Sequence, residues 1–171
     1  MVRALGLVLI TVMMAGCGAS PIPLRPAPAM LEATAQSSAQ ADLMRTIRRS
    51  VKTQPSKPFP KTQSRSLAAA QWGKVNEFVD KMQQATSPEV FTWLFGSMTG
   101  IEMNTLNTIQ QWDSPDPAEQ KARTIAADTK LAIRPLVKAL QRGLSDRAEI
   151  NRLNLEIHLA TYEAIVAIAK L

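Results

Sequence analysis

The chain has 171 residues, of which 46% are hydrophobic, 20% charged and only 5% aromatic, and its formal net charge is +6. This length and apolar content suffice for one domain with a buried core, which argues against disorder throughout the chain. A single Cys and a single His exclude an intramolecular disulfide, a cysteine-rich zinc site and a histidine cluster.

Residues 1–16 have the organisation of a secretory signal peptide. Arg3 precedes a short apolar stretch that ends at Met14, and two small residues then lead to the sole cysteine, Cys17. A basic start, a short apolar core and small residues at its end are typical of such signals. The apolar core is shorter than the roughly 20 residues that a transmembrane helix needs.

The motif Met14-Ala15-Gly16-Cys17 resembles the lipobox of bacterial lipoprotein precursors, although Met14 stands where such precursors prefer Leu. The resemblance implies cleavage before Cys17, attachment of diacylglycerol to its sulfur and acylation of the new amino group. Gly18, in a position where Asp marks inner-membrane retention, favours the outer membrane, facing the periplasm or the cell surface. The alternative is an ordinary signal peptide that is cleaved after Ala19.

Two proline-rich segments are expected to act as tethers around a helix. Residues 17–29 contain four prolines and favour a polyproline II spacer of about 3.1 Å per residue. Residues 53–66 contain three prolines and form a second linker. Residues 30–52 between them lack Gly and Pro, which predicts a helix.

The helix expected at 30–52 is amphipathic and basic. Nine of the 20 Lys and Arg residues lie in the first 66 positions, together with two of the 14 acidic residues. An apolar stripe is formed by Leu43, Met44, Ile47 and Val51. The candidate residues for binding an anionic surface are Arg45, Arg48, Arg49, Lys52, Lys57 and Lys61. They would attract anionic lipid headgroups or acidic surface polymers, unless they form only a solvated basic face on a tether.

Residues 67–171 predict four helices and no strand. Their expected bounds are about 67–85, 88–112, 117–142 and 147–171, with N-caps at Ser66, Ser87, Asp116 and Asp146. Pro135 predicts a kink and Gly143 a helix end. Because the connections are short, neighbouring helices must be antiparallel. The expected fold is therefore all-α, an up-down four-helix bundle preceded by the helix at 30–52 on its tether.

Charge patterns on the last two helices predict a register. A basic row consists of Lys130, Arg134, Lys138 and Arg142, and an acidic row consists of Glu149, Glu156 and Glu163. In an antiparallel hairpin these rows predict the ion pairs Arg142–Glu149, Arg134–Glu156 and Lys130–Glu163.

The last helix has more apolar surface than one bundle core needs. Its second stripe, roughly opposite the main one, is a candidate face for a partner or for self-association and consists of Leu155, Leu159, Tyr162 and Val166. The simpler interpretation is that the helix at 30–52 folds back and covers the surplus apolar surface.

Motifs of enzymes and cofactor sites are absent from the sequence. There is no P-loop, no Rossmann glycine pattern, no zinc motif and no calcium loop. Lipidation would consume Cys17, and His158 is expected to be a partly exposed structural residue rather than a haem ligand. We therefore expect no catalytic residue, no metal and no cofactor other than the covalent lipid.

The expected function is that of a membrane-anchored exported lipoprotein acting as a helical scaffold, adaptor or assembly factor for another envelope protein. One alternative is a module that holds an apolar ligand or lipid between loosely packed helices. A second alternative is an enzyme of unknown class. The expected partners are the membrane, an envelope protein or a second copy of the chain, and not nucleic acid, for which no motif is present.

Overall fold

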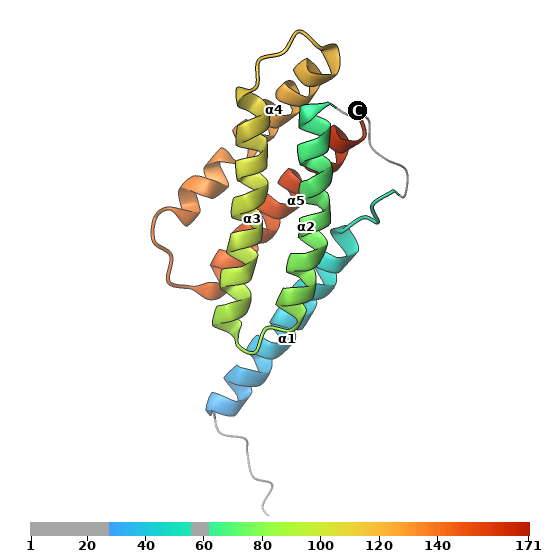
Figure 1. Ribbon diagram of the computed structural model, residues 1–171. Coiled ribbons are helices and arrows are strands. Elements are labelled where there is room, and N and C mark those ends of the chain that lie inside the picture. The colour runs from blue at the N-terminus through green and yellow to red at the C-terminus, as the bar shows by residue number, and fades with distance from the viewer. Residues whose placement is uncertain (1–27, 56–61) are drawn as a thin grey trace, which may run out of the picture.

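The computed structural model describes residues 28–55 and 62–171, which form five helices (Figure 1). The helices are α1 (Pro28–Ser50), α2 (Gln63–Gln83), α3 (Pro88–Gln111), α4 (Pro117–Leu140) and α5 (Arg147–Ala169). The described residues contain no strand, so the all-α prediction is confirmed. The predicted signal peptide, Cys17, Lys57 and Lys61 lie outside the described residues.

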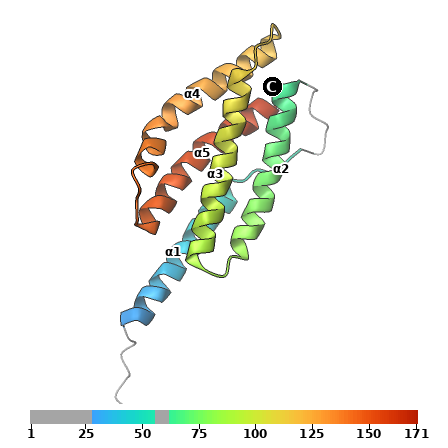
Figure 2. The same ribbon diagram turned by 60° about the vertical axis from the view of Figure 1, so that its left-hand side comes forward.

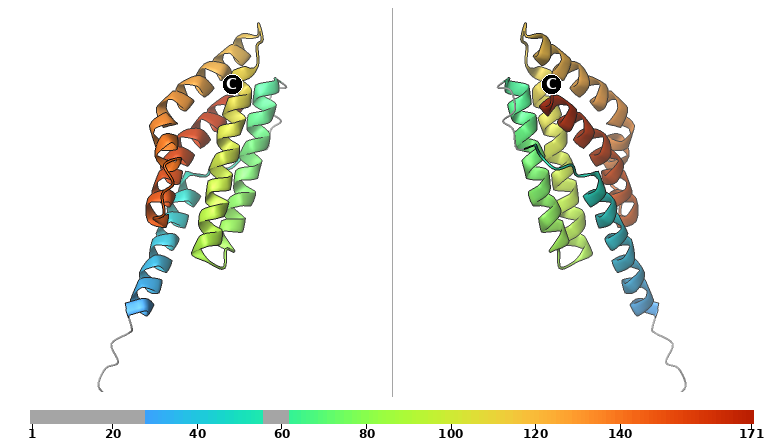
Figure 3. Two further views of the ribbon diagram at one scale, coloured as in Figure 1. Left: turned by 90° about the vertical axis from the view of Figure 1, so that its left-hand side faces the viewer. Right: turned by 90° about the vertical axis from the view of Figure 1, so that its right-hand side faces the viewer.

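Helices α2 to α5 alternate in direction, as expected for an up-down bundle (Figure 1). Helix α5 packs against each of the other three bundle helices, α2, α3 and α4. Helix α1 packs against α2 and α3, and its N-terminal half extends beyond the α2–α3 turn (Figure 3). Among the described residues, no helix combines the length and hydropathy required to cross a bilayer.

The packing of α5 against three helices explains its two apolar stripes. Tyr162 and Val166, from the stripe assigned to a partner, are 2% and 3% exposed within their own chain. The Tyr162 ring meets the buried Trp72 ring edge to face, with centroids 6.5 Å apart. Leu155 is half-buried against the same core, and only Leu159 is exposed. The predicted association face is therefore largely covered by the bundle itself.

Three of the four predicted N-caps are formed. Ser87 Oγ accepts a hydrogen bond from Val90 N at 3.3 Å. The carboxylates of Asp116 and Asp146 accept from the backbone N–H two residues later, at 2.8 and 2.9 Å. These caps depend on residues that are close in sequence, and they satisfy backbone donors that have no partner inside the helix.

The predicted start of α2 is wrong by four residues, because a contact with α4 extends the helix. The N-cap is Thr62, not Ser66, and Ser64 in the added turn is buried. Its backbone N–H donates to Glu119 Oε1 at 3.0 Å, and its hydroxyl donates to Glu119 Oε2. Burial raises the pKa of Glu119, but the hydrogen bonds from Ser64 and its neighbours outweigh this effect and lower the pKa below its ordinary value of 4.5. Glu119, in the first turn of α4, thus caps the N-terminus of α2.

The predicted ion pairs between α4 and α5 are not formed in the described structure. Arg152 lies between two members of the acidic row and binds both Glu149, at 2.7 Å, and Glu156. Pairs within one helix need no exact alignment of two helices, so they form more readily than the cross-helix pairs. The antiparallel α4–α5 hairpin itself is present, but these charges do not set its register.

The end of α4 follows the prediction. The helix includes Pro135, which cannot donate a hydrogen bond to the carbonyl of Leu131, and Figure 2 shows α4 curving away from α3 towards the α4–α5 turn. Gly143 follows with a φ of +76°, the left-handed conformation that commonly ends a helix.

Two glycine substitutions should change stability in opposite directions. Gly143→Ala forces a Cβ into the left-handed region and should lower the free energy of unfolding by about 1–2 kcal/mol. Gly100→Ala in α3 adds a Cβ that meets no atom within 4 Å, and should raise it by about 0.5–1 kcal/mol. Urea denaturation measures both, and a stabilised Gly143→Ala variant would contradict the assigned helix end.

Candidate functional site: a buried polar network under α1

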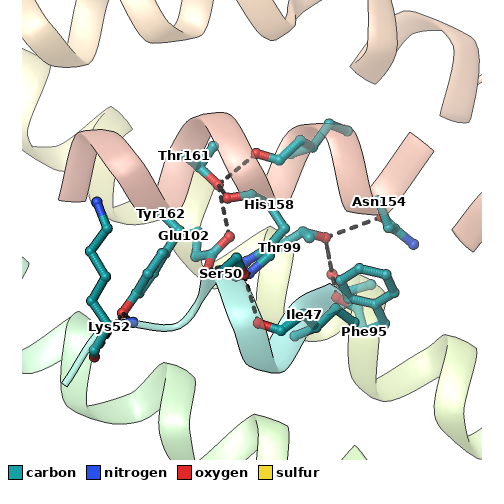
Figure 4. A network of polar contacts seen from close by, with 12 residues as sticks. Ile47, Ser50, Lys52, Phe95, Thr99, Glu102, Asn154, His158, Thr161 and Tyr162 are labelled. Carbon is teal, nitrogen blue, oxygen red and sulfur yellow. Dashed lines mark hydrogen bonds and ion pairs between the residues drawn. The ribbon is translucent and has the colours of Figure 1, made fainter. Parts of the chain in front are cut away.

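Polar side chains meet in the core where the end of α1 crosses α3 and α5 (Figure 4). The central residues are Glu102 of α3 and His158 of α5, and both are 0% exposed. His158 was predicted to be partly exposed, so that prediction is wrong. A charged or imidazole group is rarely buried completely unless other groups satisfy its hydrogen bonds.

The imidazole of His158 connects α3 to α1. Its Nδ1 lies 2.9 Å from Glu102 Oε1, and its Nε2 lies 3.1 Å from the Oγ of Ser50. The second carboxylate oxygen of Glu102 accepts a hydrogen bond from Thr161 Oγ1 at 2.7 Å. One turn away, Thr99 Oγ1 donates to Asn154 Oδ1 at 3.2 Å. A polar stripe on α5 therefore faces a polar stripe on α3.

The backbone of Lys52 is held beside this network. Its N–H donates to the Tyr162 hydroxyl at 2.9 Å, and its carbonyl accepts from Trp72 Nε1 at 2.8 Å. Burial raises the pKa of the Tyr162 hydroxyl, and the hydrogen bond from the Lys52 backbone offsets only part of this effect. The Tyr162 ring stacks on the His158 ring with centroids 5.4 Å apart. Side chains of α2 and α5 thus bind the chain directly after α1.

The Ser50 hydroxyl has a second partner inside its own helix. Ser50 Oγ lies 2.7 Å from the carbonyl oxygen of Ile47, to which it donates. With His158 Nε2 at 3.1 Å on its other side, this hydroxyl links the last turn of α1 to α5.

The order Ser50–His158–Glu102 resembles the arrangement by which hydrolases activate a serine, but it lacks what that chemistry needs. A catalytic imidazole must be reached by substrate, whereas His158 and Glu102 are both 0% exposed in the core. The main grooves on the described surface are lined by other side chains. The geometry therefore fits a structural role. The contacts among Ser50, His158 and Glu102 form a latch that holds the end of α1 on α3 and α5.

Apolar packing of α1 reinforces this latch. Ile47 is fully buried in the core, and Leu43, Met44 and Val51 are partly buried against it. The interpretation that this helix folds back on the bundle is thus confirmed, with its packing mainly on α2 and α3. Ile47 and Ser50 face inwards together, so apolar and polar contacts fix the same turn of α1.

The predicted anionic-surface residues of the described chain lie outside the network. The side chains of Arg45, Arg49 and Lys52 are exposed, and Arg45 pairs with Asp42 on the same helix. Arg48 is also exposed, although it contacts α2 through Gln83 and, at 3.8 Å, Asp80. The basic side chains therefore point to solvent while the inner face of α1 is docked.

Sequence reasoning missed the network, although two signals were present. Glu102 is the only charged residue between Val90 and Gln111. On α5, the polar residues Asn154, His158 and Thr161 recur at helical spacing next to the apolar face of the helix. An isolated charge on one apolar helix and a polar stripe on another indicate that the two groups satisfy each other in the core.

No protein-family model matches the chain, and comparison with curated proteins and with solved structures finds no match. The function must therefore be inferred from the geometry of the chain itself.

Removing the acid of the latch should destabilise the whole bundle. Glu102→Ala leaves His158 buried without its partner and should lower the free energy of unfolding by about 3–5 kcal/mol. The matched control is the exposed Glu77→Ala in α2, which should stay within about 0.5 kcal/mol of the wild type. Urea denaturation at pH 7 compares the two variants, and equal effects would show that the latch contributes nothing.

Proposed function

We propose that the protein is an exported lipoprotein in which acylated Cys17 anchors a helical adaptor for another envelope protein. The docking of α1 is the observation that carries this proposal. Ile47 is buried in the core and Ser50 contacts His158, so α1 is part of the bundle rather than a loose tether. A lipid at Cys17 would then be separated from a fixed helix by only a short proline-rich segment.

A docked α1 supports an adaptor function in physical terms. A bundle on a long flexible tether samples a large volume, whereas a bundle whose first helix is rigidly packed stays close to its anchor. A partner that binds the bundle would then be held at the membrane surface. We place this surface at the outer membrane, facing the periplasm or the outside of the cell, because Gly18 follows Cys17.

The outward basic face of α1 supports the same orientation. Arg45, Arg48 and Arg49 are exposed on α1, and Lys52 is exposed two residues after the end of this helix. Each such charge close to an anionic membrane contributes on the order of 1 kcal/mol, and salt weakens the attraction. Lipid and basic residues would together hold α1 along the membrane surface.

Lipidation predicts a defined fractionation result. Cys17→Ser should leave an uncleaved precursor or release the protein into soluble fractions, because no acyl chain can be attached. Met14→Leu, which brings the motif closer to the lipobox pattern, is the control and should remain with the membranes. A Cys17→Ser variant that matures and still fractionates with membranes would refute the lipoprotein interpretation.

The basic face predicts salt-sensitive binding to anionic vesicles. In a variant that lacks Cys17, binding to phosphatidylglycerol vesicles should weaken when Gln replaces Arg45, Arg48, Arg49 and Lys52. The control removes the same charge elsewhere, by Gln at the exposed positions Lys74, Lys81, Lys121 and Arg142. Co-sedimentation at low salt should show strong loss only for the first set. Equal loss of vesicle binding in both variants would show that the net charge of the protein, and not the position of these residues, causes the binding.

A further inference from the structure

A groove of about 520 Å³ runs between α3 and α4, on a face of the bundle that α1 does not cover. Apolar side chains from both helices line it, among them Met103, Leu131 and Val137. Leu131 is 69% exposed, and only Trp93 is equally exposed among the large hydrophobic residues of the described chain. A leucine exposed to this extent beside an apolar groove indicates a surface on which another apolar group can pack.

The groove is bordered by positive charge alone. Lys130, Arg134 and Lys138 line it, and no acidic side chain does. Lys130 donates across the groove to Gln110 of α3. The glutamates predicted to neutralise this row, Glu149 and Glu156, are bound by Arg152 instead. Lys130 is therefore bound only to a neutral amide, and Arg134 and Lys138 form no ion pair in the described structure, so the charge of the row is open to an anionic partner.

The spacing of the cations selects the kind of partner. Lys130, Arg134 and Lys138 follow one another in steps of four, which places them about 6 Å apart along the α4 axis and spreads them over about 12 Å. One lipid phosphate cannot reach all three. Acidic residues in steps of four on a second helix have the same spacing, so a helix lying along α4 could pair with the whole row.

The chain itself offers no such helix. Residues 1–27 and 56–61, which the structure does not describe, contain no Asp and no Glu. The acidic row of α5 is already engaged at two of its three positions, which leaves only Glu163 to a second copy. Charge complementarity therefore favours a different protein over this chain.

We propose that the α3–α4 groove docks an acidic amphipathic helix of the envelope partner. The apolar ridge of that helix packs on Leu131 and Val137, and its carboxylates pair with Lys130, Arg134 and Lys138. The segment from Ala127 to Gln141 is about 21 Å long, which corresponds to about 14 residues of a helix. This inference rests on the proposed adaptor function, since it names the surface to which the partner binds.

A synthetic peptide can test the groove without knowledge of the partner. The probe is a fluorescein-labelled helix of about 15 residues with a leucine ridge and three glutamates in steps of four, and its anisotropy reports binding to the mature protein in mild detergent. The double variant Arg134→Glu/Lys138→Glu should bind it at least about tenfold more weakly. The matched control, Lys74→Glu/Lys121→Glu, makes the same charge change outside the groove and should stay within about twofold.

Charge reversal provides the decisive comparison. A second peptide, with lysine in place of each glutamate, should bind the Arg134→Glu/Lys138→Glu variant about tenfold more tightly than it binds the wild type. Leu131→Ala should weaken the first peptide without any change of charge. Unchanged thermal unfolding would confirm that these exposed substitutions leave the fold intact.

Three results would overturn the proposal: no peptide binding, equal weakening by the control variant, or no rescue by the reversed peptide. Loss of phosphatidylglycerol vesicle binding in the groove variant, with unchanged peptide binding, would also overturn it in favour of a lipid. Peptide binding does not require the lipid anchor. A failed groove test alongside the expected Cys17→Ser fractionation would therefore refute the docking site alone, and the reverse result would refute only the anchor.

Discussion

The arrangement of the helices depends on the buried contact between Glu102 and His158. Each group alone would be costly in the core, because burial removes a polar group from water. Together with Ser50 and Thr161 they satisfy one another, so α1, α3 and α5 are joined at one point. Apolar packing tolerates small shifts between helices, whereas a hydrogen-bonded imidazole fits only one alignment. The polar contact therefore fixes the alignment that apolar burial leaves open.

This alignment explains how α5 can be apolar on two faces. Both faces are largely buried, and the second includes Tyr162 and Val166, of which Tyr162 binds the backbone just after α1. Tyr162 joins both kinds of contact, since its ring stacks on His158 and its hydroxyl binds the Lys52 backbone. Packing against α2, α3 and α4 leaves little apolar surface on α5 for a partner.

Features set by residues close in sequence could be predicted, and features set by distant residues could not. The N-caps at Ser87, Asp116 and Asp146 follow from the residue itself and its next turn, so their prediction is correct. The start of α2 depends on Glu119, 55 residues away from Ser64, and no local pattern contains this information. The exposure of His158 was likewise misjudged on the pattern of α5 alone, because its burial is made possible by a carboxylate of another helix.

The two polar regions of the molecule differ in whether their groups find partners within the chain. In the latch, the carboxylate of Glu102, the imidazole of His158 and the hydroxyl groups of Ser50 and Thr161 are all hydrogen-bonded to one another. Along α4, Lys130, Arg134 and Lys138 form no ion pair in the described structure, and Arg152 binds two of the three acids predicted to neutralise them. Exposed ion pairs contribute little to stability, so the absence of these pairs costs the fold almost nothing. Beside an exposed leucine, however, the same three cations can select one class of partner by charge and by spacing.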